Sequence, residues 1–168
     1  VLLGVATNWG AKKGLDDFFK LSKQLDSNYQ IILVGLTQKQ IAQLPNNIIG
    51  INRTECVERL AEAYASSDVF LNPTYEDSFP TTNLESLACG TPVITYKSGG
   101  SPEAIDDLTG TIIEQGNIGM LVDAIKKIKD NGKLFYTSSC VERAYRLYRK
   151  DERYHDYLEL YDSLLLEN

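Results

Sequence analysis

Short apolar runs recur along the chain, and most are followed by a stretch in which apolar residues return every three or four positions. The runs lack the alternation of a half-buried strand, so they predict strands that are buried on both faces. The periodic stretches predict helices with one covered side. The expected strands are 1–6, 31–34, 48–50, 69–71, 93–95 and 111–113. The expected helices are 15–25, 38–44, 57–64, 82–90, 118–128, 133–149 and a last helix within 151–168.

The order of these elements predicts the fold class. Strands and helices alternate as far as Ile128, which is typical of parallel strands joined by right-handed crossovers. We therefore expect an α/β fold with a doubly wound, Rossmann-like sheet of about six parallel strands and helices on both faces. Residues 1–168 are expected to form a single domain, because a chain of this length with 43% hydrophobic residues can bury one full core.

Composition and charge narrow the classes of partner. The formal net charge of -6 argues against a general nucleic-acid or membrane-surface binder, because such binding needs clustered Lys and Arg. Cys56, Cys89 and Cys140 are far apart and form no Cys-x-x-Cys pair, which is typical of free thiols in a reducing, cytoplasmic compartment. No apolar run approaches the roughly 20 residues of a membrane span. The abrupt start with an apolar strand leads us to expect a fragment of a longer protein.

Residues 75–96, YEDSFPTTNLESLACGTPVITY, combine acids, a turn, a helix and a strand within a short stretch. Thr82 and Glu85 have the spacing of a capping box, which predicts that a helix begins there. Gly90 can take the left-handed conformation of a helix C-terminus and Pro92 cannot continue a helix, so the helix should end between them.

Ligands of open parallel sheets bind beyond the carboxyl ends of the strands. The loops at those ends hold cations and carboxylates together. A helix N-terminus presents unpaired backbone amides, so the loop at 79–81, together with Lys13 from a neighbouring loop, is suited to a phosphate. The carboxylates of Asp77 and Glu85 are suited to the vicinal hydroxyls of a sugar or a ribose. The chain lacks the Gly-x-Gly-x-x-Gly motif and the P-loop motif, so neither a dinucleotide-binding fingerprint nor a P-loop phosphate site is supported. It also lacks any Asp-x-Asp, and no bound metal is expected.

Simpler explanations stay open for several of these residues. Glu85 could serve only the capping box, and Lys12 with Lys13 could be a surface pair at a helix start. Arg53 could likewise be an ordinary surface residue. Trp9 either packs under its loop or stacks on a ligand.

Four further features are expected to have structural roles. The pair Gly99–Gly100 should serve the geometry of a turn first and a ligand second. The adjacent acids Asp16–Asp17 and Asp106–Asp107 are expected at solvated helix or turn positions. His155, the one histidine of the chain, lies among charged residues and is expected on the surface.

The stretch from Asp77 to Gly100 closely resembles the retaining GT-B glycosyltransferases of family 4. Their second domain reads acid-Gly-Phe-Gly, then Glu-Ala-x-Ala-x-Gly-x-Pro-Val-Ile, then Gly-Gly-x-x-Glu. This chain has DSFP at 77–80, ESLACGTPVI at 85–94 and GGSPE at 99–103. A looser similarity covers nearly the whole chain, including Lys13 and Gly14 in the first loop.

The resemblance implies the C-terminal, donor-binding half of a GT-B enzyme, which binds a nucleotide-diphosphate sugar, with a UDP-sugar as the expected donor. By this similarity Glu85 would hold the ribose hydroxyls and Asp77 the transferred sugar. Lys13 matches the family's phosphate-binding lysine, whereas the family's arginine falls at Asn8. The catalytic residues implied are Asp77, Glu85 and Lys13, and the donor-binding residues are Lys12, Lys13, Arg53, Glu76, Asp77, Phe79, Pro80, Thr81 and Glu85.

The family's mechanism would retain the anomeric configuration and stabilise the leaving diphosphate with fixed cations and amides, without an obligatory metal or other cofactor. The acceptor would be held by an N-terminal domain outside this chain, so this chain alone would transfer little or nothing. The family implies polysaccharide biosynthesis in the cytoplasm, with contact to the inner membrane face through that other domain. The last helix, 151–168, would cross back toward the absent domain, and the face with Tyr154, Tyr157 and Tyr161 would otherwise be exposed and able to self-associate.

Two other functions fit the same residues. One is a non-catalytic nucleotide-binding or regulatory module on the same sheet, because a fold does not fix a function. The other is a GT-B relative that epimerises a sugar nucleotide and uses the same glutamate for the ribose. The pair of acids with the Phe turn favours transfer over epimerisation.

Overall fold

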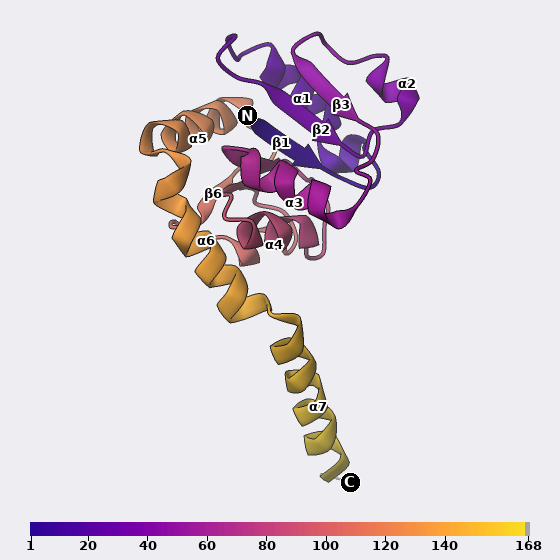
Figure 1. Cartoon of the computed structure of the whole chain (residues 1–168), viewed down its shortest axis with the longest axis vertical. Helices are drawn as coiled ribbons and strands as arrows, with labels where there is room; N and C mark the ends of the chain where they lie inside the picture. The colour runs from indigo at the N-terminus through magenta and orange to yellow at the C-terminus, as the bar shows by residue number, and fades with distance from the viewer. Residues whose placement is uncertain (167–168) are drawn as a thin grey trace.

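The computed structural model describes residues 1–166, which form one open sheet covered by helices (Figure 1). Within these residues six strands lie in the order β3-β2-β1-β4-β5-β6, and every neighbouring pair is parallel. The strands are β1 Leu2–Val5, β2 Ile31–Val34, β3 Ile48–Ile51, β4 Val69–Asn72, β5 Val93–Tyr96 and β6 Gly110–Ile113. The expected doubly wound sheet is confirmed.

The helices lie on both faces of the sheet. They are α1 Leu15–Ser22, α2 Gln38–Ile41, α3 Val57–Ser66, α4 Thr81–Ala88, α5 Ile118–Asn131, α6 Lys133–Tyr148 and α7 Lys150–Leu166, with short 3-10 turns η1 Ala11–Lys13 and η2 Ser101–Ala104. The helix α1 packs against α5, whereas α4 packs against α3 and α6. Right-handed crossovers produce this division, because the chain runs outward from β1 in one direction and outward from β4 in the other.

The middle of the sheet forms the core. Every residue of β4 and β5 is buried, which explains why these strands read as unbroken apolar runs that end in polar residues. Phe18 and Leu21 of α1 and Leu87 of α4 are almost fully buried. Two predicted helices are shorter in the structure than expected, since α1 ends at Ser22 and α2 at Ile41.

The strands β1 and β4 are neighbours at the centre of the sheet, where the strand order reverses. Crossovers leave this point in opposite directions, so the loops after β1 and β4 are not covered by a connecting helix at the sheet edge. Such a switch point is where ligands bind in open α/β sheets. It brings together the loop that carries Lys12 and Lys13 and the loop that carries Glu76 and Asp77.

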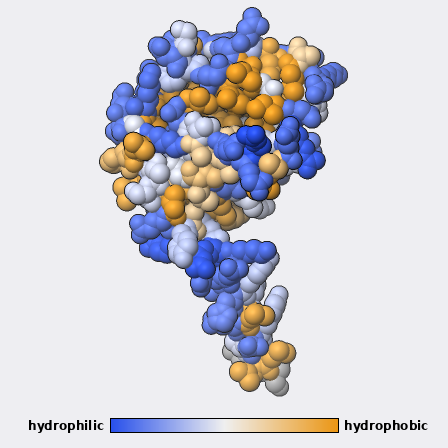
Figure 2. Space-filling view, viewed as in Figure 1, coloured by the Kyte–Doolittle hydropathy of each residue, from blue (hydrophilic) through white to orange (hydrophobic). Residues whose placement is uncertain are grey.

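The last helix, α7, extends away from the body of the molecule (Figure 1), and all its described side chains are exposed. Tyr154, Tyr157 and Tyr161 are 58–59% exposed, so the exposed tyrosine face is confirmed. In Figure 2 the middle of α7 is hydrophilic, and apolar atoms gather at its end, where Leu164 and Leu165 are exposed. The final two positions of the predicted 151–168 helix, residues 167 and 168, lie outside the described residues.

Candidate functional site

The loops after β1 and β4 are joined backbone to backbone. The Tyr75 amide donates a hydrogen bond to the Lys12 carbonyl oxygen at 2.8 Å, and the Thr74 hydroxyl donates to the same oxygen at 3.1 Å. Gly14, at φ 70°, makes the close approach possible, because a Cβ there would lie 2.2 Å from the Pro73 carbonyl oxygen. The two loops therefore form one rigid platform.

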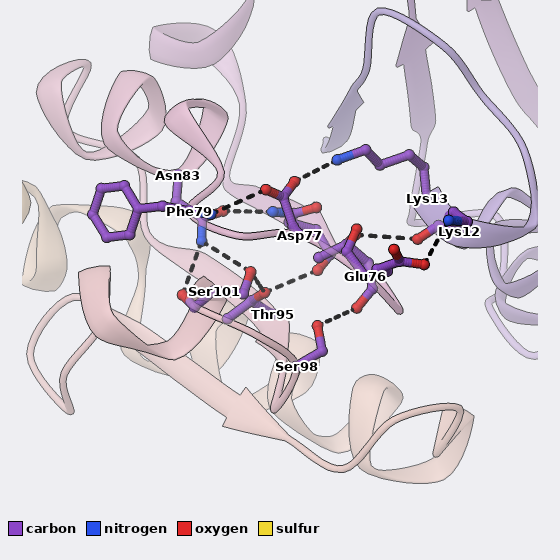
Figure 3. A network of polar contacts seen from close by, with 11 residues as sticks. Lys12, Lys13, Glu76, Asp77, Phe79, Asn83, Thr95, Ser98 and Ser101 are labelled. Atoms are coloured by element: carbon purple, nitrogen blue, oxygen red, sulfur yellow. Dashed lines mark hydrogen bonds and ion pairs between the residues drawn. The ribbon is translucent and has the colours of Figure 1, made fainter.

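Two ion pairs cross this platform. Lys13 pairs with Asp77, and Lys12 pairs with Glu76 at 2.6 Å (Figure 3). Asp77 is only 16% exposed and also accepts a hydrogen bond from the Phe79 amide at 3.2 Å, so its carboxylate fixes both the lysine and the turn. The Lys12–Glu76 pair is about 70% exposed on both sides and adds little to stability.

A groove of about 300 Å³ opens over the platform, and we call it the central groove. Its lining comes from the β1 loop, the end of β4 and the start of α4. The lining residues are Val5, Ala6, Thr7, Asn8, Trp9, Lys13, Asn72, Asp77, Phe79, Pro80, Thr81 and Thr82. The sequence therefore identified the two main sides of this groove, with Lys13 on one side and Asp77 and residues 79–81 on the other.

The predicted capping box of Thr82 and Glu85 is wrong. The helix α4 begins one residue earlier, at Thr81, with Pro80 as an N-cap that has extended backbone angles and supplies no side-chain hydrogen bond. Thr82 therefore lies inside the first turn, and the Glu85 carboxylate instead accepts a hydrogen bond from the Tyr64 hydroxyl at 3.1 Å. The explanation of Glu85 as a capping residue alone is eliminated.

The uncapped start of α4 has a chemical consequence. Among residues 1–166, neither a side chain nor a backbone carbonyl accepts the amides of Thr81 and Thr82. Both residues line the central groove, as does Lys13. Free amides at the positive end of a helix dipole, beside a lysine, form an arrangement suited to a phosphate.

Glu85 and Arg53 lie outside the lining of the central groove. Glu85 is exposed on the side of α4 that meets α3, where its partner Tyr64 is buried. Burial and the Glu85 carboxylate raise the pKa of Tyr64, so its hydroxyl stays protonated and remains a donor. Arg53 is exposed on the β3–α3 loop and has no side-chain partner within residues 1–166.

A second hollow, which we call the side groove, adjoins the central groove. Its volume is about 980 Å³, and it shares Val5, Ala6 and Thr7 with the central groove. The remaining lining residues are Val34, Gly35, Leu36, Thr37, Asn52, Arg53, Thr54, Glu55, Cys56, Val57 and Leu60. The two grooves together run across the carboxyl ends of β3, β2, β1 and β4.

The turn that contains Gly99–Gly100 supports the acid loop from behind. The Ser98 hydroxyl donates to the Thr74 carbonyl oxygen at 2.6 Å (Figure 3), and the Gly100 amide donates to the Asp77 carbonyl oxygen at 3.2 Å. Gly99 has φ 48°, and a Cβ on Gly100 would lie 2.0 Å from the Ser78 carbonyl oxygen. The expected turn role of both glycines is confirmed.

A buried polar network under the site was not predicted. The Asn83 side chain accepts from the side-chain amide of Asn72 at 2.8 Å and donates to the Ser101 carbonyl oxygen at 3.1 Å. The Thr95 hydroxyl donates to the Asn72 carbonyl oxygen at 2.9 Å and lies 2.8 Å from the Ser101 hydroxyl. The network joins β4, β5, α4 and η2 next to the acid loop (Figure 3). An asparagine at the end of an otherwise apolar run was the available signal.

The expectation that Asp17 is solvated is also wrong. Asp16 is exposed, but Asp17 is 1% exposed and accepts from Tyr75 at 2.6 Å, Tyr96 at 2.9 Å and Lys20 at 2.7 Å. Burial raises the pKa of Asp17, but the hydrogen bonds from Lys20, Tyr75 and Tyr96 together outweigh it, and the net pKa is lowered. Asp17 is therefore a buried, ionised carboxylate.

Trp9 is held in place by a hydrogen bond and by ring packing. Its indole N–H donates to the Val34 carbonyl oxygen at 2.8 Å, and its ring meets Phe18 edge-on at 5.4 Å. Trp9 therefore packs under its loop while part of it lines the central groove. His155 is 69% exposed and lies 3.2 Å from Glu159, which confirms its surface position.

The cysteines are free thiols, as predicted. Burial raises the pKa of Cys140 to about 12 and raises the pKa of Cys89 as well, so both remain protonated at neutral pH. Within residues 1–166, no helix combines the length and apolar character that crossing a membrane requires.

A doubly wound sheet with a polar groove at its switch point defines the Rossmann-like class of ligand-binding domains. More specifically, the chain belongs to the glycosyl transferases group 1 family, whose sequence model matches residues 3–146. It corresponds to the C-terminal half of the GT-B fold in family 4. The family resemblance noted in the sequence is confirmed.

Individual relatives agree with this assignment. D-inositol 3-phosphate glycosyltransferase of Mycolicibacterium smegmatis is 32% identical over 88 residues, which are 52% of this chain and 20% of that protein. Sucrose-phosphate synthase of Thermosynechococcus elongatus superposes with a TM-score of 0.86 at 22% identity, over 99% of this chain and 46% of that one. HepE of Anabaena in complex with UDP superposes with a TM-score of 0.82 at 20% identity, over 96% and 48%. The chain thus spans less than half the length of these relatives.

Proposed function

We propose that this chain is the donor-binding part of a retaining hexosyltransferase that uses a nucleotide-diphosphate sugar, and that the donor is a UDP-sugar. One observation carries the proposal: Lys13, the uncapped start of α4 and Asp77 line the same central groove, and Lys13 pairs with Asp77 there. HepE of Anabaena, which shares the fold, has been seen with UDP and with UDP-glucose. Lys13 and the α4 amides match the pyrophosphate of such a donor, and Asp77 matches its sugar.

The diphosphate would lie between Lys13 and the amides of Thr81 and Thr82. The lysine ammonium has three donor hydrogens, so it can bind phosphate oxygens while it keeps Asp77 as a partner. The helix dipole adds partial positive charge at the same place. Lys12 and Arg53 are the other cations near the grooves, and of the two only Arg53 lines one of them, so Arg53 would take the place of the arginine that the family has at the position of Asn8.

The sugar would lie against the acid loop. Asp77 has its carboxylate already oriented by Lys13 and by the Phe79 amide, so a sugar hydroxyl would find a fixed acceptor. Glu76 lies beside it, and its pair with Lys12 is exposed and weak, so Glu76 would exchange that pair for a contact to the same sugar. The backbone of 79–81 would complete the contacts to the sugar and the diphosphate.

The nucleoside would extend into the side groove. Glu85 faces α3 through its bond to Tyr64, and α3 contributes Val57 and Leu60 to that groove. Only one carboxylate oxygen of Glu85 is engaged by Tyr64, so the ribose hydroxyls would find the other oxygen free. Arg53 at the same groove has donors for the carbonyl oxygens of a base or for the α-phosphate.

Catalysis would come from electrostatic stabilisation of the leaving diphosphate. Negative charge grows on its oxygens as the glycosidic bond breaks, and Lys13 with the α4 amides would already be in place to meet it. Preorganised donors of this kind cost no reorganisation in the transition state, and each one is typically worth about 3 kcal/mol. No metal is needed in this scheme, so added EDTA should leave donor binding unchanged.

The acceptor would bind to an N-terminal domain that is not part of this chain, which would therefore transfer little sugar alone. The free thiols support a reducing, cytoplasmic location. Polysaccharide biosynthesis at the inner face of the membrane is the process we expect for the full enzyme.

Calorimetric titration of the chain with UDP, GDP and ADP and with their glucose conjugates tests the proposal. We expect binding of UDP and UDP-glucose that survives EDTA, and weaker binding of the purine nucleotides. Binding of none of these ligands would refute a donor site in this chain. Tight binding of UDP without any contribution from the sugar would instead favour a non-catalytic nucleotide module.

A further inference from the structure

Asp17 is a feature that the donor-binding scheme does not use. Among residues 1–166 it is the single charged side chain that is buried, at 1% exposure. Removing a carboxylate from water is costly, and an apolar residue would fill the same space without that cost. Packing alone therefore does not explain a carboxylate at this position.

The carboxylate of Asp17 joins three elements. One oxygen, Oδ2, accepts from the Tyr75 hydroxyl at 2.6 Å and from the Tyr96 hydroxyl at 2.9 Å. The other, Oδ1, accepts from Lys20 at 2.7 Å. The two tyrosine rings also meet edge-on, with centroids 5.4 Å apart. Helix α1, strand β5 and the loop after β4 thus meet at one charge.

Tyr75 is the member of this cluster that reaches the site. It directly precedes Glu76 and Asp77, and each of its polar groups is held. Its amide donates to the Lys12 carbonyl oxygen at 2.8 Å, its carbonyl oxygen accepts from Gln115 at 3.1 Å, and its hydroxyl donates to Asp17. Since Tyr75 is bonded to Lys12 through its amide and directly precedes Glu76 and Asp77 in the chain, the anchored tyrosine fixes one loop relative to the other.

We propose that Asp17 is a positioning residue that acts through Tyr75 to hold the Glu76–Asp77 loop in register with Lys12 and Lys13. Asp17 touches neither groove ligand nor reacting atoms in this scheme. Its effect is on the separation between the Asp77 carboxylate and Lys13, and so on the donor's diphosphate and sugar. The inference rests on the proposed function of the central groove.

The test compares Tyr75→Phe with Tyr96→Phe. Both substitutions delete one hydroxyl that donates to the same Asp17 oxygen, and both keep the ring, but Tyr96 lies in β5 and not on the acid loop. Both variants should melt at a lower temperature. Only Tyr75→Phe should weaken binding of UDP-glucose, by roughly tenfold, which corresponds to about 1.4 kcal/mol.

Two further measurements separate positioning from a general loss of stability. Binding of UMP, which lacks the β-phosphate and the sugar, should be the same in both variants and in the unchanged chain. Hydrogen exchange of the Tyr75 and Gly100 amides, which donate to Lys12 and Asp77, should be faster in Tyr75→Phe and not in Tyr96→Phe. Exchange needs no ligand, so it reports on the loop directly.

The outcomes are distinct. Equal losses of UDP-glucose affinity in the two variants would mean that affinity follows stability, and unchanged affinity in Tyr75→Phe would also overturn the inference. If the unchanged chain binds no nucleotide, the proposed function fails, and the exchange experiment then decides the inference. Faster exchange in Tyr75→Phe alone would uphold it, and equal exchange in both variants would overturn it.

Discussion

Replacement of Glu85 by glutamine separates its binding role from its structural role. The side chain is exposed on α4 and its one described contact is the Tyr64 hydroxyl at 3.1 Å. A glutamine keeps an oxygen that can accept from Tyr64, but the bond changes from a charged to a neutral acceptor, so folding should change by about 1 kcal/mol, or roughly 2–4 °C in melting temperature. The negative charge, which a ribose diol would use, is lost.

The loss of affinity follows from the kind of hydrogen bond involved. A hydrogen bond to a charged group contributes about 1.5–3 kcal/mol, against about 0.5–1.5 kcal/mol between neutral groups. With two ribose hydroxyls on the carboxylate, Glu85→Gln should cost about 1.4–3 kcal/mol, or roughly 10- to 150-fold in Kd for UDP. Titration calorimetry gives the Kd, and a thermal melt of the same sample gives the stability.

Tyr64→Phe is the matched control. It removes the hydrogen bond to Glu85 but leaves the carboxylate in place, so it should lower stability by about 1.5–3 kcal/mol and change the Kd for UDP by less than roughly threefold. An unchanged Kd in Glu85→Gln would refute the ribose contact. A drop in melting temperature that is as large as in Tyr64→Phe would show that the side chain acts in the fold.

Other predictions follow from the platform. Lys13→Ala should weaken UDP binding at least tenfold, about 1.4 kcal/mol, whereas Lys12→Ala, which loses only an exposed pair, should change it less than roughly twofold by calorimetry; equal effects would contradict this ranking. Gly100→Ala should destabilise the chain by about 2 kcal/mol or more in urea unfolding, because its Cβ would lie 2.0 Å from the Ser78 carbonyl oxygen. The folded-state pKa of Asp17 lies below its ordinary 3.8, so its contribution is complete above that pH and is lost as the pH falls through the lower value. Asp17→Asn should therefore lose about 2–3 kcal/mol at pH 7 and show a flatter loss of stability in acid; a variant with the same acid profile as the unchanged chain would argue against a buried charge.

The order of elements could be predicted from the sequence because the spacing of apolar residues differs between the two kinds of element. Apolar residues are consecutive in buried strands and recur every three or four positions in helices that are covered on one side. The apolar run Ile31–Val34, for example, lies between Gln30 and Gly35 and coincides with β2. The start of α4 was harder, since Thr82 and Glu85 match a capping box in spacing alone. Pro80 decides the helix start, because its restricted backbone supplies the extended residue that precedes the first turn.

The site was predictable where the topology of the sheet alone brings two loops together. Lys13, Asp77 and 79–81 come from two loops that any parallel sheet brings together at its switch point, so topology was sufficient to join them. Asp17 was not predictable, because its partners Tyr75 and Tyr96 are 58 and 79 residues away in the chain. The sequence predicts a solvated position for a charged residue on an amphipathic helix, and only the fold shows that two tyrosine hydroxyls bond to this one.

Trp9 provides the groove with a built-in optical reporter. It is the only tryptophan in the sequence, and it lines the central groove while its indole N–H is held by Val34. Fluorescence excited at the red edge of tyrosine absorption therefore originates from one fixed position beside the proposed diphosphate. Its quenching or blue shift on mixing with a nucleotide would follow occupancy in real time, on the unlabelled chain and at concentrations far below those that calorimetry requires.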